Sequence, residues 1–72
     1  MNVGPVFADK RGRLVQLHDN ASLSGCRETY RIWRQVGINC WEGASKVFWD
    51  LAAAEAELRR RAKRNGWTEV TE

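Results

Sequence analysis

The fold is decided by residues 50–66, DLAAAEAELRRRAKRNG, because they predict one amphipathic helix with both of its ends marked. Asp50 is a favourable N-cap, and Gly66 stands where helices commonly end in a left-handed residue. The apolar stripe recurs at steps of three and four residues and consists of Leu51, Ala54, Leu58 and Ala62. Because the stripe is rich in alanine, we expect the helix over 51–65 to pack closely against a sheet.

The stretch before the helix contains the clearest strand of the chain, residues 27–36 (RETYRIWRQV). Tyr30, Ile32 and Val36 share one face of this strand with the polar residues Glu28 and Arg34. The other face carries Arg27, Thr29, Arg31, Trp33 and Gln35. Successive side chains of a strand point to opposite sides, so this split predicts one buried face and one outward face.

The remaining segments complete a small antiparallel sheet. Val3–Ala8 and Arg13–His18 flank the polar turn Asp9–Gly12 and predict a hairpin. We expect loops at 19–25 and 38–42, a short strand or the opening of the helix at 45–49, and a last short strand at 67–70. The predicted fold is therefore α+β, a single domain over residues 1–72 with three to five antiparallel strands and one C-terminal helix on one face.

Composition predicts a small binding protein and argues against an enzyme. The chain has 72 residues, a net charge of +3 and 43% hydrophobic residues, and no apolar run long enough for a membrane span. His18 is the only histidine, so neither a cysteine–histidine catalytic pair nor a four-ligand zinc site has local support. We expect no enzymatic activity, no metal, no cofactor and no membrane partner.

Two cysteines, Cys26 and Cys40, bear on the compartment of the protein. The N-terminal residues lack the pattern of a signal peptide, and without one such cysteines are more often reduced thiols of a cytoplasmic protein. A disulfide between neighbouring strands stays open as the alternative, because sequence alone does not show whether the two Cβ atoms approach each other. We therefore expect a cytoplasmic protein with reduced cysteines.

A basic run near the end of the predicted helix is the first candidate site. Five cations fall within six residues, namely Arg59, Arg60, Arg61, Lys63 and Arg64. Cations at a helix C-terminus complement the macrodipole, which gives one interpretation. An anionic partner is the other, and the phosphate backbone of a nucleic acid is the usual one.

The outward strand face is the second candidate site, with Arg27, Arg31 and Trp33, and with Trp41 and Trp49 nearby in sequence. Cations interleaved with an aromatic ring suit stacking on an unpaired base while holding its phosphate. Tryptophan and arginine are equally the favoured anchors of a protein interface.

Burial of the four tryptophans is also predicted. We expect Trp67 and one of Trp41 and Trp49 to be buried, and Trp33 to be exposed. His18 has no obvious partner, and we interpret it as structural or merely exposed.

The chain from Tyr30 onward resembles the WGR domain, which occurs in DNA-damage-dependent poly(ADP-ribose) polymerases and in short bacterial proteins. Its most specific piece is Lys63-Arg64-Asn65-Gly66-Trp67. Further residues at compatible spacing are Tyr30, Gly37, Gly43, Phe48 and Ala54. The sequence Val36-Gly37-Ile38 stands where the family has Trp-Gly-Arg, and Cys40 replaces a second glycine of the turn.

This resemblance covers residues 30–67, about half of the chain. It implies an antiparallel sheet with one helix and a contact with nucleic acid. The DNA-binding role of the signature arginine is not carried over, because that arginine is absent.

Two functional hypotheses follow from the sequence. The first is a small module that binds nucleic acid, DNA or RNA, through the strand face and the basic helix end. The second is a protein-binding inhibitor or adaptor of the phage or plasmid type, which docks its basic face on an acidic protein surface. Homodimerisation through the tryptophan face or an unpaired sheet edge is a variant of the second hypothesis.

Overall fold

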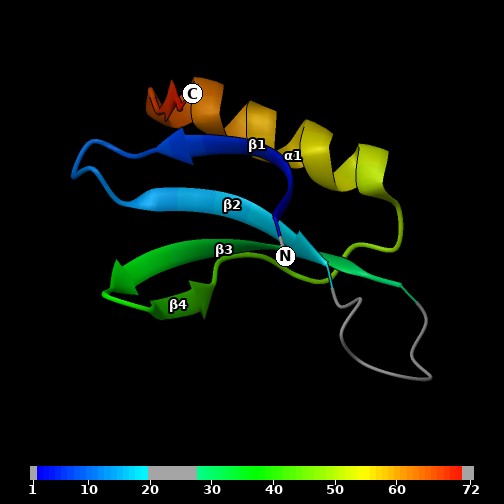
Figure 1. Cartoon of the computed structure of the whole chain (residues 1–72). Coiled ribbons are helices and arrows are strands. Elements are labelled where there is room, and N and C mark those ends of the chain that lie inside the picture. Colours follow the sequence, from blue (N-terminus) through cyan, green and yellow to red (C-terminus); the bar gives the residue numbers. More distant parts are fainter. Residues whose placement is uncertain (1, 20–27, 71–72) are drawn as a thin grey trace.

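The computed structural model describes residues 2–19 and 28–70, which form one antiparallel sheet and one helix. The elements follow the chain as β1 (Asn2–Ala8), β2 (Leu14–Asp19), β3 (Tyr30–Gly37), β4 (Cys40–Gly43), α1 (Leu51–Asn65) and β5 (Thr68–Glu69). The five strands of the sheet are ordered β4-β3-β2-β1-β5, and Figure 1 shows β4, β3, β2 and β1 side by side. The predicted α+β fold, an antiparallel sheet of three to five strands with one C-terminal helix, is confirmed.

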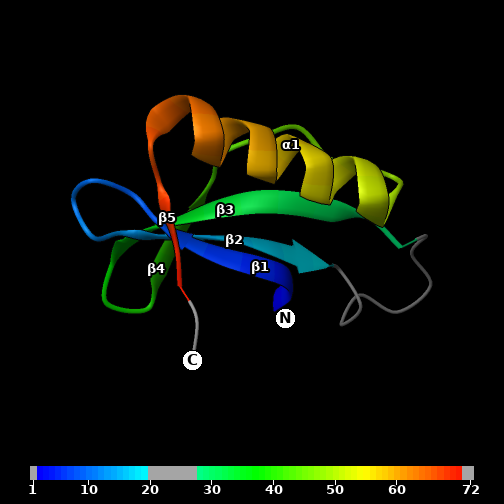
Figure 2. The ribbon, with the colours of Figure 1, turned by 90° about the horizontal axis from the view of Figure 1, so that it is seen from above.

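Helix α1 lies over one face of the sheet and leaves the other face uncovered (Figure 2). The helix begins where predicted, because the Asp50 side chain accepts a hydrogen bond from the Ala53 backbone N–H at 3.1 Å. It ends at Gly66, whose φ of 71° is left-handed and whose N–H donates to the Ala62 carbonyl. These caps fix the length of the helix and therefore the part of the sheet that it covers.

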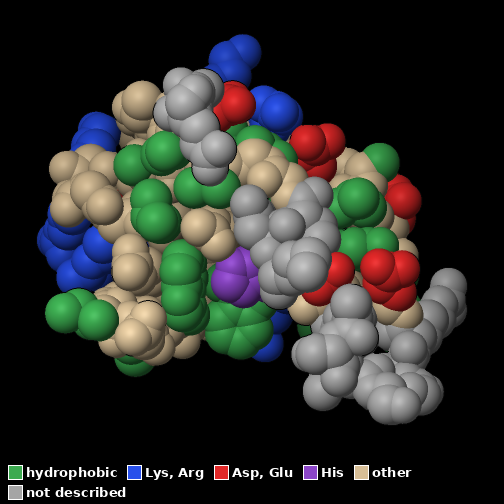
Figure 3. All heavy atoms as spheres, viewed as in Figure 1, with side chains coloured by type: hydrophobic (Ala, Val, Ile, Leu, Met, Phe, Trp, Pro, Cys, Tyr) green, Lys and Arg blue, Asp and Glu red, His purple; other side chains and the backbone are tan. Residues whose placement is uncertain are grey.

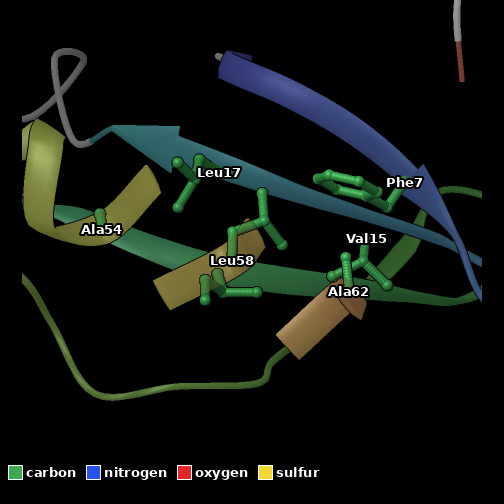
Figure 4. Close-up of a cluster of buried hydrophobic side chains, with 7 residues drawn as sticks. Phe7, Val15, Leu17, Ala54, Leu58 and Ala62 are labelled. Carbon is green, nitrogen blue, oxygen red and sulfur yellow. The ribbon is translucent and has the colours of Figure 1, made fainter. Parts of the chain in front are cut away.

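The core lies between α1 and the sheet (Figure 4). Its buried residues are Phe7, Val15, Leu17, Ile32, Ala54, Leu58 and Ala62. Leu17 and Ile32 are cross-strand partners in β2 and β3 and are both fully buried. The small side chains Ala54 and Ala62 let the helix approach the strands closely, as the alanine-rich stripe predicts.

The cross-strand register determines which side chains share the uncovered face. Gln16 lies opposite Trp33 and His18 opposite Arg31 in the pairing of β2 with β3. In the pairing of β3 with β4, Gln35 lies opposite Trp41. These residues alternate with the buried positions of β2 and β3, so they project from the side away from α1. We call this side the open face.

Two local predictions differ from the structure. Residues 38–42 were expected to be a loop, but Cys40–Gly43 form β4 and pair with β3 through a turn in which Asn39 takes a positive φ of 55°. Residues 45–49 form neither a strand nor part of α1, and within them only Phe48 forms an isolated β-bridge, with Tyr30. The strand predicted over residues 27–36 is β3, which begins at Tyr30; residue 27 lies outside the described residues.

Candidate functional site

The open face carries three aromatic rings that come from three different strands. The ring of His18 in β2 lies 6.3 Å from the ring of Trp33 in β3, with an angle of 25° between their planes. The same His18 ring lies 5.3 Å from the ring of Trp41 in β4, tilted by 57°. We call His18, Trp33 and Trp41 the aromatic platform. All three side chains are only half-buried, so part of each ring faces solvent.

One cation is held in a fixed place beside this platform. The guanidinium carbon of Arg31 lies 5.3 Å from the centroid of the Trp33 ring, a cation–π distance. The Arg31 Nε–H donates to the Ser45 carbonyl at 2.8 Å, which anchors the side chain at one point. No oxygen among the described residues accepts a hydrogen bond from its terminal N–H groups. Within the described part of the chain, the terminal N–H groups of Arg31 are therefore left for a partner at the edge of the platform.

Gly43 makes room for this arginine. A Cβ atom at Gly43 would lie 2.5 Å from the Arg31 guanidinium carbon, far inside van der Waals contact. Because Gly43 pairs with Trp33 across the strands, the guanidinium of Arg31 occupies space beside Trp33 that a larger residue would fill. Gly43 thus positions the cation of the open face.

His18 is held in place by its neighbours and is neutral near pH 7. Its Nε2–H donates to the Gln16 side-chain oxygen at 2.8 Å. Partial burial disfavours the charged imidazolium and lowers the pKa of His18 below its ordinary value of 6.5. At neutral pH the ring is therefore an uncharged, flat surface, which suits stacking better than charge pairing.

A pocket of about 180 Å³ adjoins the platform. It lies where the ends of β2 and β3 meet, and it reaches the segment that precedes α1. Its lining consists of His18, Asp19, Thr29, Tyr30, Arg31, Trp33 and Val47. The open face thus combines flat rings, an anchored cation and an adjoining pocket. Figure 3 shows the histidine (purple) among hydrophobic side chains on this face.

The structure separates the residues that the sequence singled out. Arg31 and Trp33 lie together on the open face, as their strand positions predict, but Trp33 is half-buried rather than exposed. Arg27 lies outside the described residues. Trp67 packs against the core but is half-buried rather than buried, and Trp49 is 59% exposed.

The basic run of α1 lies on the opposite side of the sheet, and most of its charge is paired. Arg59 lies 3.7 Å from Glu55 and 3.4 Å from Glu69, and Arg60 forms an ion pair with Glu57. Arg61 donates to Glu57 at 2.9 Å and to the Ala44 carbonyl at 2.7 Å.

The two hydrogen bonds of Arg61 tie the helix to the segment after β4. The hydrogen bonds from Arg60 and Arg61 hold the pKa of Glu57 below its ordinary value, so Glu57 is ionised at neutral pH. Lys63 and Arg64 are exposed and form no ion pair among the described residues. Of the five cations in the run, these two are therefore the ones left for an external anion.

Two members of the aromatic platform were not placed there by sequence reasoning. His18 was interpreted as structural or exposed, and Trp41 as one of two choices for burial. The signal for His18 was present, since it alternates with Val15 and Leu17, but Leu14 blurs that alternation. Trp41 was not placed on this face because a loop was expected at 38–42, whereas Trp41 lies in strand β4, which pairs with β3.

Within residues 2–19 and 28–70, no group of three or more His, Cys, Asp and Glu residues is placed to hold a metal ion. In the same part of the chain, no helix is long and apolar enough to cross a membrane. Cys40 is exposed and unpaired among the described residues, and Cys26 lies outside them.

The chain matches no protein-family model, no curated protein and no solved structure. The resemblance of residues 30–67 to the WGR domain therefore stays a prediction.

Proposed function

We propose that the protein is a non-enzymatic module that binds nucleic acid, with unpaired bases lying on the open face. The observation that carries this proposal is the aromatic platform with Arg31 at its edge. Base–aromatic stacking tolerates every base because each base has a flat π-face. A binding surface of this type therefore requires rings and a cation on an accessible sheet, which is the arrangement of β2, β3 and β4.

Three features support an unpaired strand over a duplex. The rings lie on a sheet face, and recognition of unpaired bases commonly uses aromatic side chains on such a face. The neutral state of His18 keeps the platform free of a charge that would need its own partner. The adjoining pocket gives a base that is turned out of the strand a place beside Trp33 and Arg31.

The cation and the rings have separate expected contributions. Each stacked base contributes about 1–3 kcal/mol, so loss of the Trp33 ring should weaken binding about fivefold to 150-fold. A phosphate held by Arg31 adds about 0.7 to the slope of log affinity against log salt for a single strand. Variants of the two residues therefore have distinguishable effects.

The test is a fluorescence-anisotropy titration of labelled single-stranded and duplex DNA and RNA at about 50 and 200 mM salt. Trp33→Leu should reduce affinity at both salt concentrations, and Arg31→Gln should also reduce the salt slope. Arg60→Gln is the matched control, since it removes an equal charge from the outer surface of α1. If the control weakens binding as much as Arg31→Gln does, the open face is not the binding surface.

A second candidate function is docking on a partner protein, which exposed apolar side chains favour. Ile38 in the β3–β4 turn is 94% exposed and Trp49 is 59% exposed. Large apolar side chains in solvent are typical anchors of protein interfaces. A chain that binds none of the oligonucleotides but loses a captured protein partner on Ile38→Asn substitution would support docking instead.

A further inference from the structure

A second pocket lies at the other end of the molecule, between the β1–β2 turn and the end of α1. Its volume is about 300 Å³. The residues that line it come from three segments far apart in sequence and are Asp9, Lys10, Arg11, Arg13, Arg34, Asn65 and Trp67. Arg34 lies opposite the buried Val15, so this pocket is on the helix side of the sheet and away from the open face.

This pocket concentrates the positive charge of the protein. Of the described residues, it contains four of the eleven cationic side chains and one of the eight acidic ones. The seven cations and seven acids that the structure describes elsewhere balance, so the net positive charge of the described residues resides at this site. Figure 3 shows Lys and Arg gathered at the end with the β1–β2 turn and Asp and Glu toward the opposite end.

The single carboxylate of the pocket, that of Asp9, accepts hydrogen bonds from the backbone of the β1–β2 turn. Asp9 Oδ1 accepts hydrogen bonds from the backbone N–H groups of Arg11 and Arg13, both at 2.9 Å. Asp9 also receives the N–H of Gly12 on its own carbonyl, so it holds the turn together. Its role is to shape the turn, and it leaves most of the surrounding positive charge uncompensated.

Arg34 contributes a buried donor that no other described residue satisfies. Its Nε atom has no hydrogen-bond partner among them, and the Oδ2 atom of Asp9 is 4.0 Å away, beyond hydrogen-bond distance. The guanidinium carbon of Arg34 lies 5.9 Å from the centroid of the Trp67 ring, which supports it from one side. A guanidinium held in this way, with its charge poorly compensated, favours an incoming anion.

We propose that this pocket binds a small molecule that carries a di- or triphosphate group. Four cations that converge on a concave site match a compact ligand with several negative charges better than the single charge of each phosphate in a nucleic-acid strand. The Trp67 ring provides an apolar wall for the organic part of such a ligand. This inference does not rest on the open face, because the two sites share no lining residue.

The C-terminal end of α1 disfavours an anion in this pocket, but Lys10 compensates for it. The C-terminal end of a helix carries partial negative charge, and Asn65 belongs to the last turn of α1. Lys10 lies against this end, since a Cβ atom at Gly66 would be 3.6 Å from its Cε atom. The ammonium group of Lys10 therefore offsets the helix end, and three arginines are left for the ligand.

The experiment is an NMR titration of the ¹⁵N-labelled protein with inorganic pyrophosphate, compared with sodium chloride at matched ionic strength. Saturable shifts are expected at the backbone amides of residues 10–13 and at the indole N–H of Trp67. Arg13→Gln should weaken pyrophosphate binding about tenfold, because a charge-assisted contact is lost. Arg34→Gln should weaken it at least as much.

Arg64→Gln is the matched control, because it removes an equal charge from an exposed position outside the pocket lining. The control should change the affinity less than twofold, which distinguishes a site from general attraction. The Arg13 side chain is exposed and its backbone bonds are retained on substitution, so Arg13→Gln tests the site even if Arg34→Gln fails to fold.

Three outcomes overturn the proposal: shifts equal to those with chloride, equal weakening by Arg64→Gln, and shifts of the pocket residues with an oligonucleotide but not with pyrophosphate. The last would assign the pocket to the nucleic-acid strand. The failure of open-face variants to affect oligonucleotide binding would bear only on the proposed function.

Discussion

The two faces of the sheet are formed by the same central strands but differ in what covers them. On the helix side, Val15, Leu17 and Ile32 are fully buried against α1. On the open face, His18 and Trp33 from those same strands are only half-buried, although burial of a large aromatic ring stabilises a fold. The helix side therefore accounts for stability, and the open face retains apolar ring surface that the fold itself does not use.

This difference separates residues that hold the protein together from residues available to a partner. Substitutions of the buried core residues on the helix side should lower the free energy of unfolding and leave the affinity of the folded protein for a single strand unchanged. Substitutions around Arg31 on the open face should lower that affinity and leave the free energy of unfolding nearly unchanged.

The largest effect is expected in the core. Leu58 is fully buried, so Leu58→Ala should lower the free energy of unfolding by about 2–5 kcal/mol through lost apolar contacts and a residual cavity. Urea denaturation followed by circular dichroism measures this change. An effect below about 1 kcal/mol would show that α1 is not packed on the sheet as described.

A smaller effect distinguishes two neighbouring cations of the helix. Arg61→Gln should cost about 1–2 kcal/mol, since it removes the hydrogen bond to the Ala44 carbonyl and leaves Glu57 with fewer donors. Arg60→Gln should cost less than about 0.5 kcal/mol, because its ion pair is exposed to solvent. Thermal denaturation of both variants gives the comparison, and equal losses would contradict the anchoring role of Arg61.

On the open face, Gly43→Ala should affect binding and not stability. The added methyl group would displace the Arg31 guanidinium from its place beside Trp33. Loss of the cation–π contact should weaken binding of a single strand about two- to fivefold. The free energy of unfolding should stay within about 0.5 kcal/mol of the original. Unchanged affinity would show that the position of Arg31 does not matter.

The smallest effect concerns the titration of His18. Its pKa in the folded protein is lowered by partial burial, so the unfolded chain binds the proton more readily. The free energy of unfolding should therefore rise as the pH increases from the lowered folded pKa through 6.5 and then level off. Denaturation at several values between pH 5.5 and 7.5 should show this rise, and His18→Gln should remove it. A rise that survives the substitution would assign it to another group.

The sequence was sufficient to predict the fold where the signals were local. The N-cap Asp50, the stripe through Leu58 and the end at Gly66 specify α1 within one segment, and the structure reproduces each of them. The alternation around Ile32 predicted which side of β3 is buried. These features depend on residues a few positions apart, so periodicity and capping preferences are enough.

Features that depend on contacts between distant segments were not predictable in this way. The platform requires the register that places Gln35 opposite Trp41, and β4 begins after a turn in which Asn39 adopts a left-handed conformation. The second pocket joins Lys10, Arg34 and Trp67, which are far apart in sequence. The basic run of α1, by contrast, is partly neutralised by ion pairs with glutamates. The number of cations in the run therefore suggested more unpaired positive charge than the structure has.

Binding on the open face is tested most directly by an NMR titration of the ¹⁵N-labelled protein with a single-stranded oligonucleotide, observed at the indole N–H signals of the tryptophans. Saturable shifts of the Trp33 and Trp41 signals are expected, with the amides of residues 59–64 unchanged. Shifts confined to the helix amides, with the Trp33 and Trp41 signals unmoved, would contradict the assignment of the open face as the binding surface.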